Sequence, residues 1–285
     1  MPGFGNISEY ALADAAGRTI TASYRKTPVN AVPMGWWSDF SMVSGNPPPN
    51  YYAASPLEAA TLVDFKGIFH GDDQSPATKF LAAMALVTPT AAIVGPYKLL
   101  DYLLYYPFID GDSSDEQAMV NDTTLPRYTT GDGVMVMAVA VTPSTGGGSF
   151  TFNYIDQDGN AKTSPVQVCS TTAANIGNIV TSQQNVTGMP GGPFLTLASG
   201  STGVRSITSV TFSVLNGGLL ALVLVKPLAD LCIREINTEA ELSYVNQKMP
   251  PPRIYDGAYL NLIGRPTVVA GAATLAGRFS FLWSG

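Results

Sequence analysis

The feature that most constrains the fold is an apolar run, Gly133–Val141 (GVMVMAVAV), in which every residue after the glycine is apolar. A run of this length that is rich in β-branched valine is typical of a β-strand buried on both faces. After a break rich in Pro and Gly, the stretch Ser149–Ile155 (SFTFNYI) alternates with a period of two. This alternation places Phe150, Phe152 and Tyr154 on one face of a second strand.

Turn residues and further strand patterns extend this β-structure in both directions. The turn-forming sequence Asp156–Asn160 (DQDGN) leads into a third strand, Lys162–Cys169, so we expect an antiparallel meander. Farther along, the alternating stretch Arg205–Leu215 is followed by Asn216–Gly218 (NGG) and the apolar stretch Leu219–Lys226. This pattern predicts a β-hairpin.

Together these patterns predict a mainly β protein, an antiparallel β-sandwich of the jelly-roll type, with its β-domain over residues 127–285. The two hairpins would supply facing sheets, and the apolar strands Val134–Val141 and Leu219–Val225 would lie at the centre. The aromatic end of the chain, Arg278–Gly285 (RFSFLWSG), is unsuited to a free tail, so we expect it to be held in a sheet or against a neighbour.

Residues 76–126 are predicted to form short helices and an acidic loop. Ser75 and Pro76 are suited to begin a helix that runs to Val87, and Pro96–Tyr106 (PYKLLDYLLYY) begins with a proline and is followed by another. The acidic segment Asp110–Asp122 does not match the spacing of a helix–loop–helix calcium site, so we interpret it as a solvated loop.

Residues 1–75 are predicted to form an extended arm that is rich in Pro, Gly and aromatic residues. The Pro triplet at 47–49 favours extended backbone, and Trp36, Trp37, Tyr51 and Tyr52 need a surface on which to be buried. We consider these four residues the candidate interaction residues of the arm. Two alternatives stay open: the arm lies along a neighbouring subunit, or it wraps its own domain.

Composition favours assembly and argues against several functions. Of 285 residues, 46% are hydrophobic and only 13% are charged, which is expected where other subunits cover much of the surface, although a large monomer with a dry interior would have a similar composition. The 15 basic residues are scattered and the net charge is −6, so direct nucleic-acid binding is not expected. The sequence shows no secretion signal and no apolar run of membrane-spanning length, which predicts a cytoplasmic product with no membrane partner.

Residue chemistry nominates no catalytic, cofactor or metal site. His70 is the only histidine, and it lies beside Asp72 and Asp73, but there is no nucleophile motif for it to serve. Cys169 and Cys232 are too few for a disulfide framework or a zinc site, and we expect both to be buried free thiols. We therefore predict a protein that is not an enzyme and carries no cofactor.

Three segments carry a resemblance to a known class of protein. The segments Tyr105–Asn153, Asn216–Lys226 and Asp256–Leu262 (DGAYLNL) resemble virion structural proteins of tailed bacteriophages, with closest likeness to head-associated proteins. The resemblance implies a virion (capsid) location, after assembly in the host cytoplasm, and no enzymatic activity. It carries over no functional residue.

The leading hypothesis is a capsid cement or decoration protein that forms a homo-oligomer, such as a trimer, and binds across subunits of the major capsid protein. Apolar burial of this kind would contribute roughly 25 cal/mol per Å² before association costs. The alternatives are another virion component, either the major capsid protein or a tail protein, and a receptor- or carbohydrate-binding module that uses Trp36 and Trp37 as its platform.

Overall fold

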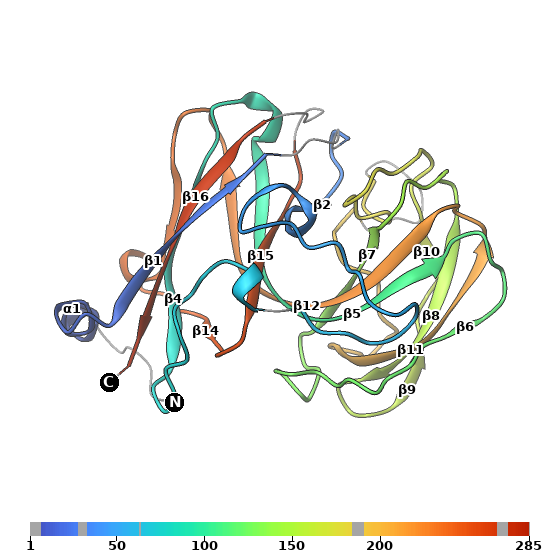
Figure 1. Ribbon diagram of the computed structural model, residues 1–285, viewed down its shortest axis with the longest axis horizontal. Coiled ribbons are helices and arrows are strands. Elements are labelled where there is room, and N and C mark those ends of the chain that lie inside the picture. Colours follow the sequence, from blue (N-terminus) through green and yellow to red (C-terminus); the bar gives the residue numbers. More distant parts are fainter. Residues whose placement is uncertain (1–6, 28–32, 63, 184–190, 267–272, 285) are drawn as a thin grey trace.

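The computed structural model describes residues 7–27, 33–62, 64–183, 191–266 and 273–284, which fold into two lobes that share one long sheet (Figure 1). The strands of these residues are grouped in three sheets, and every pairing between named strands is antiparallel. The prediction of a mainly β, antiparallel sandwich is confirmed.

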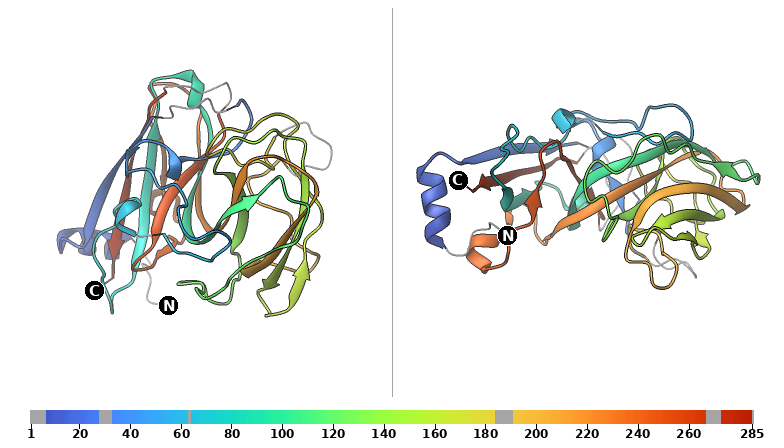
Figure 2. Two further views of the ribbon diagram at one scale, coloured as in Figure 1. Left: turned by 45° about the vertical axis from the view of Figure 1, so that its right-hand side comes forward. Right: turned by 90° about the horizontal axis from the view of Figure 1, so that it is seen from below.

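The shared central sheet has the strand order β2–β15–β5–β12–β7. Its strands are β2 (Ser38–Asp39), β5 (Gly95–Asp110), β7 (Met135–Ala140), β12 (Leu219–Ile233) and β15 (Tyr259–Gly264). β5 and β12 are 16 and 15 residues long, and they pass from one lobe into the other (Figure 2). They are buried over most of their length because both faces of this sheet are covered.

The first lobe, on the left of Figure 1, holds both ends of the chain. Its own sheet has the order β13–β4–β16–β1–β3, and β14 also pairs with β4. These strands are β1 (Thr19–Lys26), β3 (Gly45–Asn46), β4 (Lys79–Val87), β13 (Ala240–Ser243), β14 (Arg253–Ile254) and β16 (Leu275–Trp283). A core that includes Met84, Leu99, Leu260 and Phe279 joins this sheet to the central one.

The second lobe, on the right of Figure 1, is formed by the chain between β5 and β12. Its sheet has the order β10–β8–β11–β6, with β9 paired to β8. These strands are β6 (Gln117–Ala118), β8 (Ser149–Asp156), β9 (Ala161–Thr163), β10 (Gln167–Val168) and β11 (Val204–Val214). Its core includes Leu103, Val136, Phe150, Phe152 and Leu222.

Helices are short in the described chain. The α-helices are α1 (Ile7–Ala15) and α2 (Tyr244–Gln247), and the 3₁₀ helices are η1 (Phe40–Met42), η2 (Asp64–Lys66) and η3 (Ala91–Ile93). The two helices predicted for Ser75–Val87 and Pro96–Tyr106 are wrong. The first stretch contains β4, and the second lies within β5. Leu- and Tyr-rich runs with few charges fit either period, and burial of both faces between sheets selects the strand.

Local strand predictions hold better than the predicted pairings. The strands over Val134–Val141 and Ser149–Ile155 are confirmed as β7 and β8, with Phe150, Phe152 and Tyr154 buried on one face. The predicted meander is correct in one pairing and wrong in the other: its third strand pairs with β8, as β9 and β10, but β7 pairs with β12 and not with β8. The hairpin formed by β11 and β12 is wrong for the same reason: the chain crosses from one sheet to the facing sheet at Asn216–Gly218 instead of turning back within one.

The first and last strands of the described chain pair with each other in the first lobe's sheet. β1 pairs with β16 over eight residue pairs, from Thr19↔Leu282 to Lys26↔Leu275. The aromatic C-terminal segment is therefore held in a sheet, as predicted. In the described residues 7–27, the predicted arm forms α1 and the strand β1 instead of extending away from the domain.

Candidate functional site

The segment of residues 33–62, called the strap below, lies over the face of the central sheet that neither lobe's own sheet covers. It packs Trp37, Met42 and Tyr52 against Leu100 and Tyr102 of β5 and the other members of a third core. In the described residues, the arm therefore wraps its own domain. This is one of the two alternatives that the sequence left open.

Three of the four aromatic residues predicted to interact with a partner are buried within the chain. Trp36 is 3% exposed and Trp37 is 5% exposed, and Tyr52 is fully buried. Trp36 belongs to the core of the second lobe, whereas Trp37 and Tyr52 belong to the core beneath the strap. Only Tyr51, at 51% exposure, is open to solvent. A contact between Tyr51 and a partner stays a prediction.

A buried carboxylate, Asp39, fixes the strap to the central sheet. Its oxygens accept hydrogen bonds from the hydroxyl of Tyr52, from the hydroxyl of Tyr102 at 2.7 Å and from the backbone N–H of Ser41 at 2.8 Å. Burial raises the pKa of Asp39, and these hydrogen bonds oppose the increase. A buried carboxylate that accepts three hydrogen bonds within the fold has a structural role, here to hold the strap on the central sheet.

His70 and Lys79 form a second buried polar cluster. The Lys79 ammonium donates to His70 Nδ1 at 3.0 Å, to backbone oxygens of Gly71 and Asp72, and lies 3.4 Å from Asp256 Oδ1. An ammonium can only donate, so Nδ1 is the acceptor and Nε2–H donates to the Ala258 oxygen at 2.9 Å. Both ring nitrogens of the only histidine are thus occupied inside the protein.

Just before this cluster, residues 64–70 form a segment that we call the Phe65–Phe69 loop. Ile68 and His70 are buried, and the N–H of Ile68 donates to the oxygen of Leu260 at 2.8 Å. Phe65, which precedes Ile68, is 72% exposed, and Phe69, between Ile68 and His70, is 56% exposed. The exposure of this pair was not predicted from the sequence. The available signal was two phenylalanines in a glycine-containing segment with neither strand nor helix periodicity.

A groove of about 500 Å³ opens where the strap meets the end of β5, and we call it the Trp37 groove. The cations of Lys98 and Arg265 each lie 5.8 Å from the centre of the Trp37 ring, within cation–π range. Lys98 also pairs with Asp230 at 2.5 Å. Among the described residues, the indole N–H of Trp37 has no hydrogen-bond partner. The groove therefore offers an aromatic edge and the cation of Arg265, which has no ion-pair partner among the described residues.

The junction of the two lobes contains a buried ion pair. Arg127 binds Asp101 through two hydrogen bonds of 2.9 and 2.6 Å and donates to the Gly257 oxygen at 2.8 Å. Burial raises the pKa of Asp101 to about 6, against the lowering effect of Arg127. Along β5, Asp101 lies between Leu99 of the first lobe's core and Leu103 of the second lobe's core.

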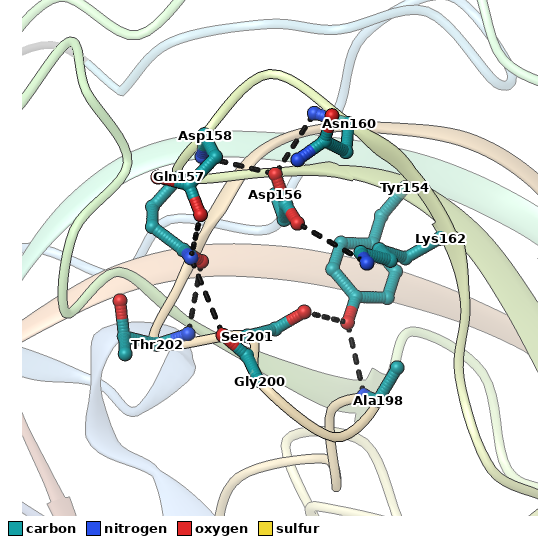
Figure 3. Close-up of polar contacts among 10 residues, drawn as sticks. All are labelled: Tyr154, Asp156, Gln157, Asp158, Asn160, Lys162, Ala198, Gly200, Ser201 and Thr202. Carbon is teal, nitrogen blue, oxygen red and sulfur yellow. Dashed lines mark hydrogen bonds and ion pairs between the residues drawn. The ribbon is translucent and has the colours of Figure 1, made fainter.

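The β8–β9 hairpin carries a network of polar contacts in the second lobe (Figure 3). Asp156 accepts the backbone N–H groups of Asp158 and Asn160 at 2.9 Å, and its other oxygen lies 3.9 Å from Lys162. Burial acts to raise the pKa of Asp156, but the two amides and Lys162 lower it overall. The predicted turn is confirmed.

The same network ties the hairpin to the loop before β11. Gln157 bonds to Gly200 and Thr202, while the hydroxyl of Tyr154 donates to Ser201 and accepts the N–H of Ala198 (Figure 3). The side chains therefore serve turn formation and loop attachment.

Acidic groups elsewhere are arranged as exposed surface. Asp110, Asp112, Asp115 and Glu116 are exposed, as expected of a solvated loop. Among the described residues, no group of three or more His, Cys, Asp or Glu side chains is placed to hold a metal ion. Cys169 is a buried free thiol, as predicted, whereas Cys232 is exposed, because it lies near the end of β12 beyond the part covered by β7.

Comparisons with known proteins assign no family. No protein-family model matches the chain, and no curated protein matches it. The structure "Crystal structure of infectious bursal disease virus VP2 subviral particle" is 10% identical, with 94% of this chain and 80% of that chain covered and a TM-score of 0.17. The structure "Structure of infectious bursal disease virus Gt strain" is 11% identical over 93% and 78%, with a TM-score of 0.18. Similarity at these TM-scores carries no argument about fold or function.

The described helices are also too short or too polar to cross a membrane.

Proposed function

We propose that this chain is a non-enzymatic structural component of a virion that acts by packing against other protein subunits. The observation that carries the proposal is the Phe65–Phe69 loop. Two phenylalanines, one on either side of the buried residue Ile68, face solvent, and His70 directly after Phe69 is also buried. Complete burial of a fully exposed phenylalanine contributes about 1.5–3 kcal/mol, so a protein surface that covered the exposed 72% of Phe65 and 56% of Phe69 would gain roughly 2–4 kcal/mol before association costs.

The surface around such contacts is suited to assembly. Charged residues make up 13% of the chain, and further large apolar side chains are exposed, including Leu12 at 65% and Met34 at 63%. Monomeric proteins rarely leave much apolar surface uncovered. Exposed apolar surface can be covered by further copies of this chain, for which we expect a trimer. It can also be covered by a shell protein.

The more specific proposal is a cement or decoration protein of a tailed-phage head, located in the capsid and bound across major capsid protein subunits. The resemblance of Tyr105–Asn153 and Asp256–Leu262 to head-associated proteins supports it. The carbohydrate-platform alternative loses its motivation, because Trp36 and Trp37 are buried.

The test is the double substitution Phe65→Ser and Phe69→Ser, with Val166→Ser on the second lobe as the matched control. We expect the unchanged chain to form a defined oligomer by light scattering and to co-sediment with empty capsids. The double variant should keep its far-UV circular dichroism spectrum and lose capsid binding by at least about tenfold, since tenfold corresponds to only about 1.4 kcal/mol. Equal co-sedimentation of the double variant and the control would refute the role of the loop.

A further inference from the structure

One edge of the central sheet is left open where β12 runs beyond β7. β12 pairs with β5 down to Ile233↔Gly95, but β7 covers only Leu220–Val225 on the other side. Beyond that point the described residues supply no strand to pair with the outer side of β12. We call residues 229–233 the β12 edge.

The direction of the free backbone groups follows from the neighbouring strand. The oxygen of Pro96 accepts the N–H of Arg265, so the backbone of Pro96 faces β15 and that of Tyr97 faces β12. Leu231, opposite Tyr97, therefore points its N–H and C=O toward β5. Asp230 and Cys232, one residue to either side, point theirs outward, where an added strand would meet them.

A hollow flanks the β12 edge on each side. The Trp37 groove and a second hollow of about 480 Å³ share the residues Asp230, Leu231 and Cys232. Asp230 is paired with Lys98, so its side chain lies on the face of the Trp37 groove, and Leu231 lies on the opposite face. Alternate side chains of an added strand would thus enter different hollows.

The second hollow is acidic, and we call it the acidic pocket. Its lining includes Glu235, Glu239 and Glu241 beside a single arginine, Arg234. Arg278 pairs with Glu239 at 2.7 Å, and within the described chain Glu235 and Glu241 have no ion-pair partner. The acidic pocket therefore favours a basic side chain, whereas the Trp37 groove favours an aromatic or apolar one.

We propose that the β12 edge binds an extended segment of a partner protein, which adds to the central sheet as a further strand. Strand addition takes its affinity from main-chain hydrogen bonds and its specificity from pockets for alternate side chains. The segment would place a lysine or arginine opposite Leu231, in the acidic pocket, and aromatic or apolar residues on either side of it, in the Trp37 groove.

A second copy of the same edge is a poorer occupant. Pairing two β12 edges would bring two acidic pockets together, with Glu235 and Glu241 of each copy facing like charge. Charge complementarity thus selects a basic segment of a different surface. The inference deepens the proposed function and rests on it only for the identity of the partner.

The first experiment uses the full chain and a synthetic seven-residue peptide with lysine at its centre, phenylalanine on both sides of the lysine, and threonine beyond. Isothermal titration calorimetry should detect binding. A peptide of the same sequence with N-methylated phenylalanines should bind at least about tenfold more weakly, because it cannot donate the main-chain hydrogen bonds. Equal binding by the two peptides, or no binding of the unmethylated one, would overturn the inference.

The second experiment changes the protein. Cys232→Pro removes an outward N–H from an edge position that tolerates proline, whereas Cys232→Ser keeps it. The proline variant should bind the lysine peptide about tenfold more weakly than the serine variant. Glu241→Lys should weaken binding of the lysine peptide and strengthen binding of a peptide with glutamate at its centre. If Cys232→Pro and Glu241→Lys both bind the lysine peptide with unchanged affinity, the β12 edge is not the binding site. If the proline variant does not fold, the N-methylated peptide tests the main-chain hydrogen bonds instead.

The two proposals fail separately. If Cys232→Pro co-sediments with capsids as well as Cys232→Ser does, the β12 edge is not the capsid contact and the structural role stands. If the unchanged chain never co-sediments with capsids but binds the lysine peptide, the structural role fails and the β12 edge stands.

Discussion

Replacing Arg127 by methionine should destabilise the protein in a pH-dependent way, because it leaves the Asp101 carboxyl buried without its cation. Asp101 is 1% exposed, and Arg127 donates two hydrogen bonds to it. Removing one partner of a buried ion pair costs about 3–5 kcal/mol. We expect a loss of that size at pH 8.

The pH dependence follows from the pKa of Asp101. In the native chain burial raises this pKa to about 6 from 3.8, so the folded state holds the proton over a range in which the unfolded state releases it. Stability from this group is highest below pH 3.8 and falls as pH rises to about 6, by roughly 3 kcal/mol at about 1.4 kcal/mol per pKa unit. Without Arg127 the pKa rises further, so the fall extends above pH 6.

Urea unfolding followed by tryptophan fluorescence at pH 5 and pH 8 measures the effect. Arg127→Met should lose more stability relative to the native chain at pH 8 than at pH 5, because protonation of Asp101 removes the buried charge. The double variant with Asp101→Asn should lose this additional dependence. A variant whose loss is equal at both pH values, or is below about 1 kcal/mol, would show that the pair is not desolvated as the structure places it.

Two further predictions concern single residues. In the native protein the exposed Cys232 should react with a thiol reagent within minutes. Cys169 is buried, and burial raises its pKa to about 12, so it should react only after unfolding. Mass spectrometry should therefore find one label per native chain. Gly45→Ala should destabilise the folded protein by more than about 1 kcal/mol, because Gly45 has a φ of +142° and a Cβ there would lie 2.0 Å from the Arg25 oxygen. The control is Gly192→Ala, where an added Cβ would have no atom within 4 Å. Thermal denaturation should show a change of no more than about 0.5 kcal/mol for this control.

Short-range patterns in the sequence were reliable where a single strand buries one face. The alternation around Phe152 predicted β8 and its buried face, and the DQDGN turn predicted the hairpin to β9. Both depend on neighbours within a few residues, so the sequence contains the necessary information.

The same approach failed where a segment is buried on all sides. Lys98 and Asp101 are three residues apart in a Leu- and Tyr-rich run. This spacing would place them on one face of a helix, and the run is equally compatible with a buried strand. In the fold they lie on opposite faces of β5, Lys98 by Trp37 and Asp101 by Arg127. Contacts with residues far along the chain decide between the two structures.

The candidate sites show the same division. The exposure of Phe65 and Phe69 depends on Ile68 docking against Leu260, about two hundred residues away along the chain. The aromatic content of the strap was evident from the sequence, but its burial against its own central sheet was not.

The sequence by itself determined that this chain is an antiparallel β protein with little surface charge, because strand periodicity, turn residues and composition are local properties. Only the tertiary structure decided which strands pair, which aromatic residues are buried and which edge stays open. The pairing of strands and the exposure of side chains depend on contacts between residues far apart in the sequence. All strands of the chain compete to pair with a strand such as β12, and no local sequence pattern encodes the outcome of that competition.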